Sequence, residues 1–227
     1  MSPKPNGNSL DSKIEYAGAL PNQDAVAAPA GPPLLLTSTF GNPTPAGMFA
    51  FAGTMLLMAL YNLGAGGVHV SNVLVGMLVF AGGIAQFMVA MWEIARGNTL
   101  FATCFLSFST FWLSYAAVLI PSFGVMEAYK DAPEELPKAL GLYLFVWFIT
   151  IFLHLPAVIG KSHMFTVLLS FASLAVLMLS CGMYTQIKTL SIVGNSLLLV
   201  VCSLAYYIGL AGLLASDPGS AFTLPLF

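Results

Sequence analysis

Polar residues inside apolar segments are the part of this sequence that could do chemistry, because each costs free energy in lipid unless it faces protein or water. Asn72, Gln86 and Glu93 lie at multiples of seven residues, so they project in nearly one direction from a helix. Gln86 fits a substrate path or a plain interhelical hydrogen bond. Glu93 fits a proton-linked or substrate-attracting carboxylate, or an ion pair with Arg96.

Two rows of side chains recur at helical spacing in the segment 100–120. Hydroxyls can replace part of a carboxylate's hydration, and aromatic rings can narrow a path between such sites. The alternative is that the hydroxyls bond to carbonyls of their own helix and the rings only pack. The hydroxyl row is Thr103, Ser107, Thr110 and Ser114, and the aromatic side of the helix carries Cys104, Phe108, Phe111 and Tyr115.

His154 is an ionisable residue in an otherwise apolar segment. Such a residue is functional by default, which makes His154 a candidate for proton coupling together with Glu93. The alternative is a neutral imidazole that is bonded to a carbonyl freed by Pro156 and has no role in transport.

A proline-rich turn leads into the first apolar segment. Asn42 is a favoured N-cap residue and Pro43 fits the first helical position, so the sequence predicts that a helix begins here. Pro45 removes a second donor, which leaves mainly the N–H groups of Asn42 and Thr44 to meet a ligand. One face of this helix is the first candidate for a pore lining: Phe51, Met55, Met58 and Asn62.

Composition places the chain among polytopic membrane proteins. The mean hydropathy is +0.89, 58% of residues are hydrophobic and only 7% are charged, against about 25% charged in soluble domains. A net charge of −2 suggests no nucleic-acid partner. The three histidines lack metal-ligand spacing and no catalytic motif occurs, so we expect no metal, no cofactor and no enzymatic activity.

Six apolar segments are long enough to cross a bilayer, which predicts an all-α integral membrane fold. We expect a disordered N-terminal tail over 1–40, a six-helix transmembrane domain over 41–215 and a short C-terminal tail over 216–227. In the long loop before the fourth span, Asp131 and Glu134 predict a helix start that Pro137 could kink. The distribution of Lys and Arg favours cytoplasmic termini by one residue. The expected spans are 46–63, 71–92, 100–120, 139–160, 164–183 and 191–214.

Several motifs in order resemble the acetate uptake transporter family of bacterial succinate–acetate permeases and fungal acetate permeases. They are Asn42-Pro-Thr-Pro-Ala-Gly-Met, Gly82-Gly-Ile-Ala-Gln-Phe, Glu93 followed by Gly97-Asn-Thr, and Ser107 with Phe111-Trp112. The likeness extends from about Gly41 to Leu214.

The resemblance implies a six-helix protomer, often a hexamer, in the plasma membrane, that moves acetate and related small monocarboxylates with protons or down their gradient. It assigns Asn42 and Pro43 to the opening of the path and Phe51 to a gate. Three residues depart from the family's pattern. Phe108 stands where a tyrosine is usual, which predicts a drier gate. Ala46 replaces the leucine that usually follows the second proline, and His154 stands where an apolar residue is expected.

Two other functions fit the same residues. One is export of ammonium or ammonia, since aromatic rings can offer cation–π contacts. The other is a non-conducting membrane sensor or scaffold, for which the aromatic gate and the long tail would be the reason.

Overall fold

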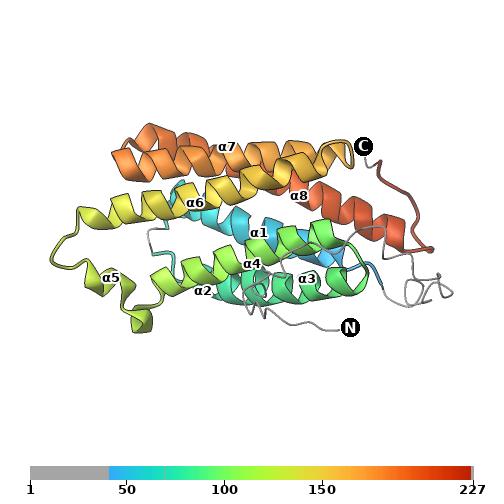
Figure 1. Cartoon of the computed structure of the whole chain (residues 1–227), viewed down its shortest axis with the longest axis horizontal. Helices are drawn as coiled ribbons and strands as arrows, with labels where there is room; N and C mark the ends of the chain where they lie inside the picture. The colour runs from blue at the N-terminus through green and yellow to red at the C-terminus, as the bar shows by residue number, and fades with distance from the viewer. Residues whose placement is uncertain (1–40, 69, 226–227) are drawn as a thin grey trace, which may run out of the picture. The chain divides into compact units, whose positions relative to one another are not determined.

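The computed structural model describes residues 41–68 and 70–225, and within these residues every regular element is helical. Six helices of this part are long and apolar enough to cross a membrane (Figure 1). The predicted fold class, an all-α integral membrane protein with six spans, is therefore confirmed. The tail predicted for residues 1–40 lies outside the described residues.

The six spans begin and end within a few residues of their expected positions. Short helices connect some of them: η3 (Ala65–Gly67), η5 (Pro121–Phe123) and α5 (Val125–Ala128). The second span is built from three consecutive elements, α2 (Val73–Gly76), η4 (Met77–Ala85) and α3 (Gln86–Ala95). The other spans are α1 (Thr44–Asn62), α4 (Thr99–Leu119), α6 (Glu135–Val158), α7 (His163–Thr185) and α8 (Lys188–Ser216).

The spans pack in a ring. Helix α6 packs along α7, α7 along α8, and α8 along α1, and Figure 1 shows α6 and α7 running side by side. Helix α1 contacts η4 and α3, which in turn pack on α4. Contacts between α4 and α6 are sparse, so the ring is loosest at this seam.

The second span contains a π-helical segment, η4, that changes which residues share a face. A π-helix closes its hydrogen bonds over five residues instead of four, so each residue turns less about the axis. Gln86 and Glu93 follow η4 and are both fully buried, whereas Asn72 precedes it and is exposed. The predicted common face therefore holds for Gln86 and Glu93 and is wrong for Asn72.

Two glycines of η4 allow helix α4 to approach closely. A Cβ atom on Gly82 would lie 2.6 Å from Cγ of Trp112, and one on Gly83 would lie 2.5 Å from Cδ2 of Leu113. Both distances are shorter than real Cβ contacts, so any larger residue must displace its neighbour. The glycine pair therefore brings η4 and α4 into close contact.

The fourth span begins later than Asp131. Helix α6 starts at Glu135, and the preceding residues form turns in which Ala132 N–H donates to the Tyr129 carbonyl and Glu135 N–H to the Ala132 carbonyl. Pro133 disfavours helical backbone at the residue before it, which delays the helix. Pro137 falls in the first turn, where its missing N–H disrupts no helical hydrogen bond, and the proline inside the helix is Pro156.

Candidate functional site

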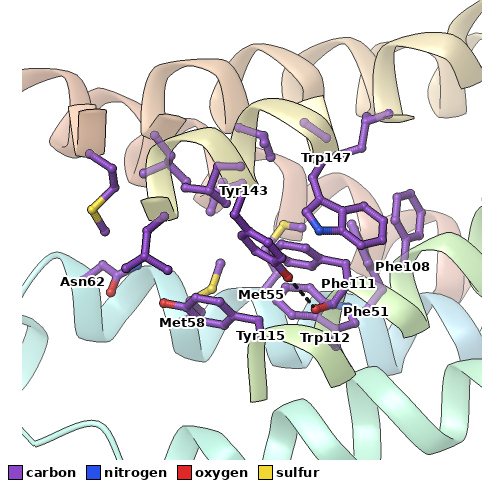
Figure 2. A pocket seen from close by; sticks show the side chains of 18 residues that line it. Phe51, Met55, Met58, Asn62, Phe108, Phe111, Trp112, Tyr115, Tyr143 and Trp147 are labelled. Atoms are coloured by element: carbon purple, nitrogen blue, oxygen red, sulfur yellow. Dashed lines mark hydrogen bonds between the residues drawn. The ribbon is translucent and has the colours of Figure 1, made fainter. Parts of the chain in front are cut away.

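A cavity of about 60 Å³ lies inside the ring of helices (Figure 2). Side chains from α1, α4, α6, α7 and α8 line it. The four residues that were expected to share one face of the first helix, Phe51, Met55, Met58 and Asn62, all line this cavity. Within 41–68 and 70–225 no charged side chain lines it, so the cavity is an apolar chamber with a few neutral polar groups.

Phe51 and Phe108 meet at one end of the cavity. Their ring centroids are 4.8 Å apart with an interplanar angle of 34°, and the Trp112 ring lies 6.3 Å from that of Phe51. Phe51 is 2% exposed and Phe108 is 5% exposed. Rings at this separation are in direct contact, so this conformation leaves no passage between them. A hydroxyl is also lacking here, because position 108 is phenylalanine.

An aromatic wall follows along the cavity. Phe111 packs on Tyr143 and Trp147 of α6, with centroid distances of 6.1 and 5.3 Å (Figure 2). The Tyr143 hydroxyl donates to the Phe111 carbonyl over 3.2 Å and lies 2.7 Å from Ser114 Oγ. Tyr143 and Trp147 were not among the predicted site residues, although their spacing of four residues on one helix is a signal that could have found them.

Two asparagine side chains are joined at the other end of the cavity. Asn62 Nδ2 donates to Asn195 Oδ1 over 3.0 Å, and Asn195 Nδ2 donates to the Ser191 carbonyl over 2.8 Å. Asn195 is 3% exposed. It too was missed, although an amide inside the sixth apolar segment was visible in the sequence.

A buried carboxylate lies near the start of α1. Glu93 is fully buried; Thr44 Oγ1 donates to its Oε1, and Asn98 Nδ2 donates to its Oε2 over 2.8 Å. Among the described residues, Lys130 and Glu127 are the pair whose charged nitrogen and oxygen atoms lie within 4.0 Å of each other. The alternative of an ion pair between Glu93 and Arg96 is therefore wrong. Hydrogen bonds from neutral donors hold this carboxylate instead.

Asn42 is the centre of a second group of hydrogen bonds at the same place. Arg96 Nη1 donates to Asn42 Oδ1 over 2.9 Å, and the Thr44 N–H donates to the same oxygen over 3.2 Å. Helix α1 begins at Thr44 with Pro43 as N-cap, one residue later than predicted, but the Asn42 side chain still accepts from the N–H two residues on, as the predicted cap would. The Thr44 N–H that was expected to meet a ligand is occupied by the Asn42 side chain.

Gln86 lies outside the cavity and bonds between helices. Its Nε2 donates to the Gly47 carbonyl over 3.3 Å, and its Oε1 is buried without a hydrogen-bond partner. The bond to Gly47 joins α1 to α3, so Gln86 makes the hydrogen bond between helices that was the alternative to a place in the substrate path.

The hydroxyl row of α4 also lies outside the cavity. Thr103 Oγ1 donates to the Thr99 carbonyl over 2.8 Å, and Thr110 Oγ1 donates to the Leu106 and Ser107 carbonyls. A hydroxyl satisfied by its own helix can face away from the bundle, and Thr103 and Thr110 are exposed. The row that faces the cavity is the aromatic one, so the structure does not bring Thr103, Ser107 or Thr110 to this chamber.

His154 lies in a separate groove between α4 and α6. Its Nδ1 lies 2.6 Å from the Thr150 carbonyl oxygen, which is not the carbonyl that Pro156 would free, because proline removes the bond to the residue four positions before it. The structure thus separates His154 from the cavity. In the described part of the chain no group of three His, Cys, Asp or Glu side chains could hold a metal ion.

Comparisons with known proteins agree with this architecture. The family model described as the GPR1/FUN34/yaaH family matches residues 29–227. The "accumulation of dyads protein 2" of Saccharomyces cerevisiae is 39% identical over 76% of this chain and 61% of its own length, and the "ammonia transport outward protein 2" of the same yeast is 36% identical over 77% and 62%. The chain thus spans a little over three fifths of the length of these relatives.

A solved structure has the same fold. The structure of the bacterial acetate channel SatP superposes with a TM-score of 0.73, at 25% identity, over 83% of this chain and 99% of that chain. The family match covers far more than half of the sequence, and the fold is shared. The chain is therefore a member of the GPR1/FUN34/yaaH family.

Proposed function

We propose that this protein moves acetate and related small monocarboxylates across the membrane through the cavity inside its helical ring. The observation that carries the proposal is a cavity between the Phe51–Phe108 contact and the Asn62–Asn195 pair. One water molecule needs about 10–15 Å³ of cavity volume, so a cavity of about 60 Å³ accommodates roughly four to six water-sized groups. A molecule of the size of acetate fits this space.

The lining suits a carboxylate that must bind and then leave. A carboxylic acid with a pKa near that of Glu, about 4.3, is ionised at neutral pH and costs several kcal/mol or more to transfer into hydrocarbon without partners. The lining offers neutral donors: the second N–H of the Asn62 amide and the Tyr115 hydroxyl. Neutral donors hold an anion more weakly than Lys or Arg would, which favours release. The shared fold with a protein named an acetate channel supports this substrate class.

The proposed path begins at Asn42, Pro43 and Thr44, close to the buried carboxylate of Glu93. About 10 Å along α1, at a rise of about 1.5 Å per residue, it meets the gate of Phe51 and Phe108. It then passes Met55 and Phe111 to Asn62. Gln86, Thr103, Ser107 and Thr110 lie off this line, and among them Gln86 holds α3 against α1 through its bond to the Gly47 carbonyl.

We further propose that Glu93 takes part in proton coupling, because it is the buried carboxylate nearest to the start of the path. The working form is a homo-oligomer, a hexamer by resemblance, with the transport domain over 41–215, in the plasma membrane with cytoplasmic termini. The activity is transport and not catalysis.

The direct test is uptake of labelled acetate by liposomes that contain the purified protein. We expect saturable uptake that succinate or propionate reduces, and alkalinisation of the external medium if protons accompany the anion. Protein that is folded and inserted but carries no carboxylate at any pH gradient would refute the proposal.

Ammonium is the second candidate substrate, because one of the relatives is named an ammonia transport outward protein. The aromatic wall of the cavity could bind ammonium by cation–π contacts. Measuring acetate and ammonium fluxes in the same liposomes separates the two, since an ammonium pathway would carry labelled methylammonium and would not respond to acetate.

A further inference from the structure

A second hollow, distinct from the transport cavity, lies at the loose seam between α4 and α6. It is a groove of about 540 Å³ with polar side chains on both walls. Thr99 and Thr103 line it from α4, and Thr150 and His154 line it from α6, with Lys161 just beyond the end of that helix. None of these residues contributes to the transport cavity.

One imidazole nitrogen in the groove lacks a partner. The Thr150 carbonyl can only accept a hydrogen bond, so His154 Nδ1, 2.6 Å away, carries the proton. In the neutral ring this leaves a lone pair on Nε2. Nε2 is buried and has no hydrogen-bond partner within the described structure, and an unsatisfied buried acceptor is costly. His154 lines the groove, so a ligand there with an acidic proton would satisfy this acceptor once the imidazole turns to expose Nε2.

The same groove has uncompensated positive charge. Lys161 is exposed and lines it, whereas no Asp or Glu of the described residues does. Thr99 and Leu100, which also line it, are the first two residues of α4, and no side chain caps that helix. Their N–H groups lack partners within the helix and form its positive end. A ligand that fits must combine negative oxygens with one proton.

We propose that this groove binds a phosphate monoester. One proton is shared between a phosphate oxygen and His154 Nε2, while the remaining oxygens accept hydrogen bonds from Lys161 Nζ and the start of α4. A monoester releases its second proton near pH 6, so a proton is still available close to neutrality. A phosphate diester has no such proton, and carboxylic acids lose theirs near pH 4. The preference for a monoester over a diester follows from the unpartnered acceptor.

The position of the groove fits the headgroup region of a bilayer. His154 lies four residues before the end of α6, which is about 6 Å at a rise of about 1.5 Å per residue. Neighbouring Leu153 lines the groove and is 67% exposed. Basic pockets between membrane helices bind anionic headgroups. The monoester can thus come from a lipid such as phosphatidic acid or from a soluble phosphate.

The test uses the full chain in phosphatidylcholine nanodiscs that contain either phosphatidic acid or phosphatidylglycerol, an anionic diester. Bound lipid is counted by native mass spectrometry. We expect phosphatidic acid to bind preferentially, and His154→Leu and Lys161→Gln each to weaken it about tenfold or more, the loss expected for a hydrogen bond that involves charge. Lys188→Gln, at the start of α8, removes a cation away from the groove and should bind as the unmodified protein does.

The controls separate loss of the site from loss of the fold. His154→Gln offers an amide oxygen as acceptor, so it should recover part of the binding that His154→Leu loses, and helicity by circular dichroism checks folding. Competition by millimolar inorganic phosphate identifies a soluble source, and its failure to compete identifies the lipid. Equal binding of both anionic lipids, or binding insensitive to His154 and Lys161, overturns the proposal. So does a groove found buried against a second copy of the chain.

Discussion

Removing the ring of Phe51 should raise the acetate flux, because the closed gate depends on its contact with Phe108. The rings are 4.8 Å apart, and opening the gate must separate them. Such a pair contributes about 0.5–1.5 kcal/mol beyond the area that it buries. If opening limits transport, Phe51→Ala lowers the barrier by this amount, which corresponds to about a two- to tenfold faster flux at about 1.4 kcal/mol per decade.

The assay is initial uptake of labelled acetate in liposomes with equal amounts of inserted protein. Phe49→Ala is the matched control, because Phe49 lies on the same helix but pairs with Tyr206, 6.1 Å away, and does not line the cavity. Phe51→Leu, which keeps more of the side-chain volume, guards against simple loss of stability. An unchanged or reduced flux in both Phe51 variants, with the protein folded, would refute the gate. The same increase in Phe49→Ala would show that loosened packing is the cause.

Other predictions concern stability and proton coupling. Thr44→Val leaves Glu93 with one hydrogen bond fewer and should lower the free energy of unfolding in mixed micelles by about 1.5–3 kcal/mol; Thr103→Val, which loses only a bond to its own helix, should change it by less than about 0.5 kcal/mol. Gly82→Ala places a Cβ atom 2.6 Å from an indole carbon and should cost about 1–3 kcal/mol, whereas Gly76→Ala meets nothing within 4 Å and should cost nothing. Glu93→Gln should abolish acetate-dependent proton uptake in liposomes while acetate still exchanges; proton uptake that persists would exclude Glu93 as the coupling group.

The sequence predicted the spans and the face of α1 because both depend on local information. Long apolar runs identify membrane helices, and regular α-helical spacing brought Phe51, Met55, Met58 and Asn62 to one cavity. The opposition of Phe51 and Phe108 could be inferred only by resemblance, since nothing in either segment states which helices become neighbours.

The predictions that were wrong concern side chains whose helical spacing is compatible with more than one set of hydrogen-bond partners or more than one helix face. Hydroxyls on a membrane helix can line a path or bond to their own carbonyls, and Thr103 and Thr110 do the latter. Asn72 was placed on the wrong side because a π-helical segment cannot be recognised from apolar spacing alone. Charge proximity in the sequence also failed to predict that Arg96 bonds to Asn42.

The nine π-helical residues Met77–Ala85 also bear on how this span can change in length. A π-helical turn can take up an additional residue locally. In a regular α-helix the same insertion would rotate every residue that follows it. Shortening the chain by one residue within this stretch can be absorbed locally by tightening the coil. The part of the span before Met77 and the part that carries Glu93 can therefore keep their separate orientations while the number of residues between them varies.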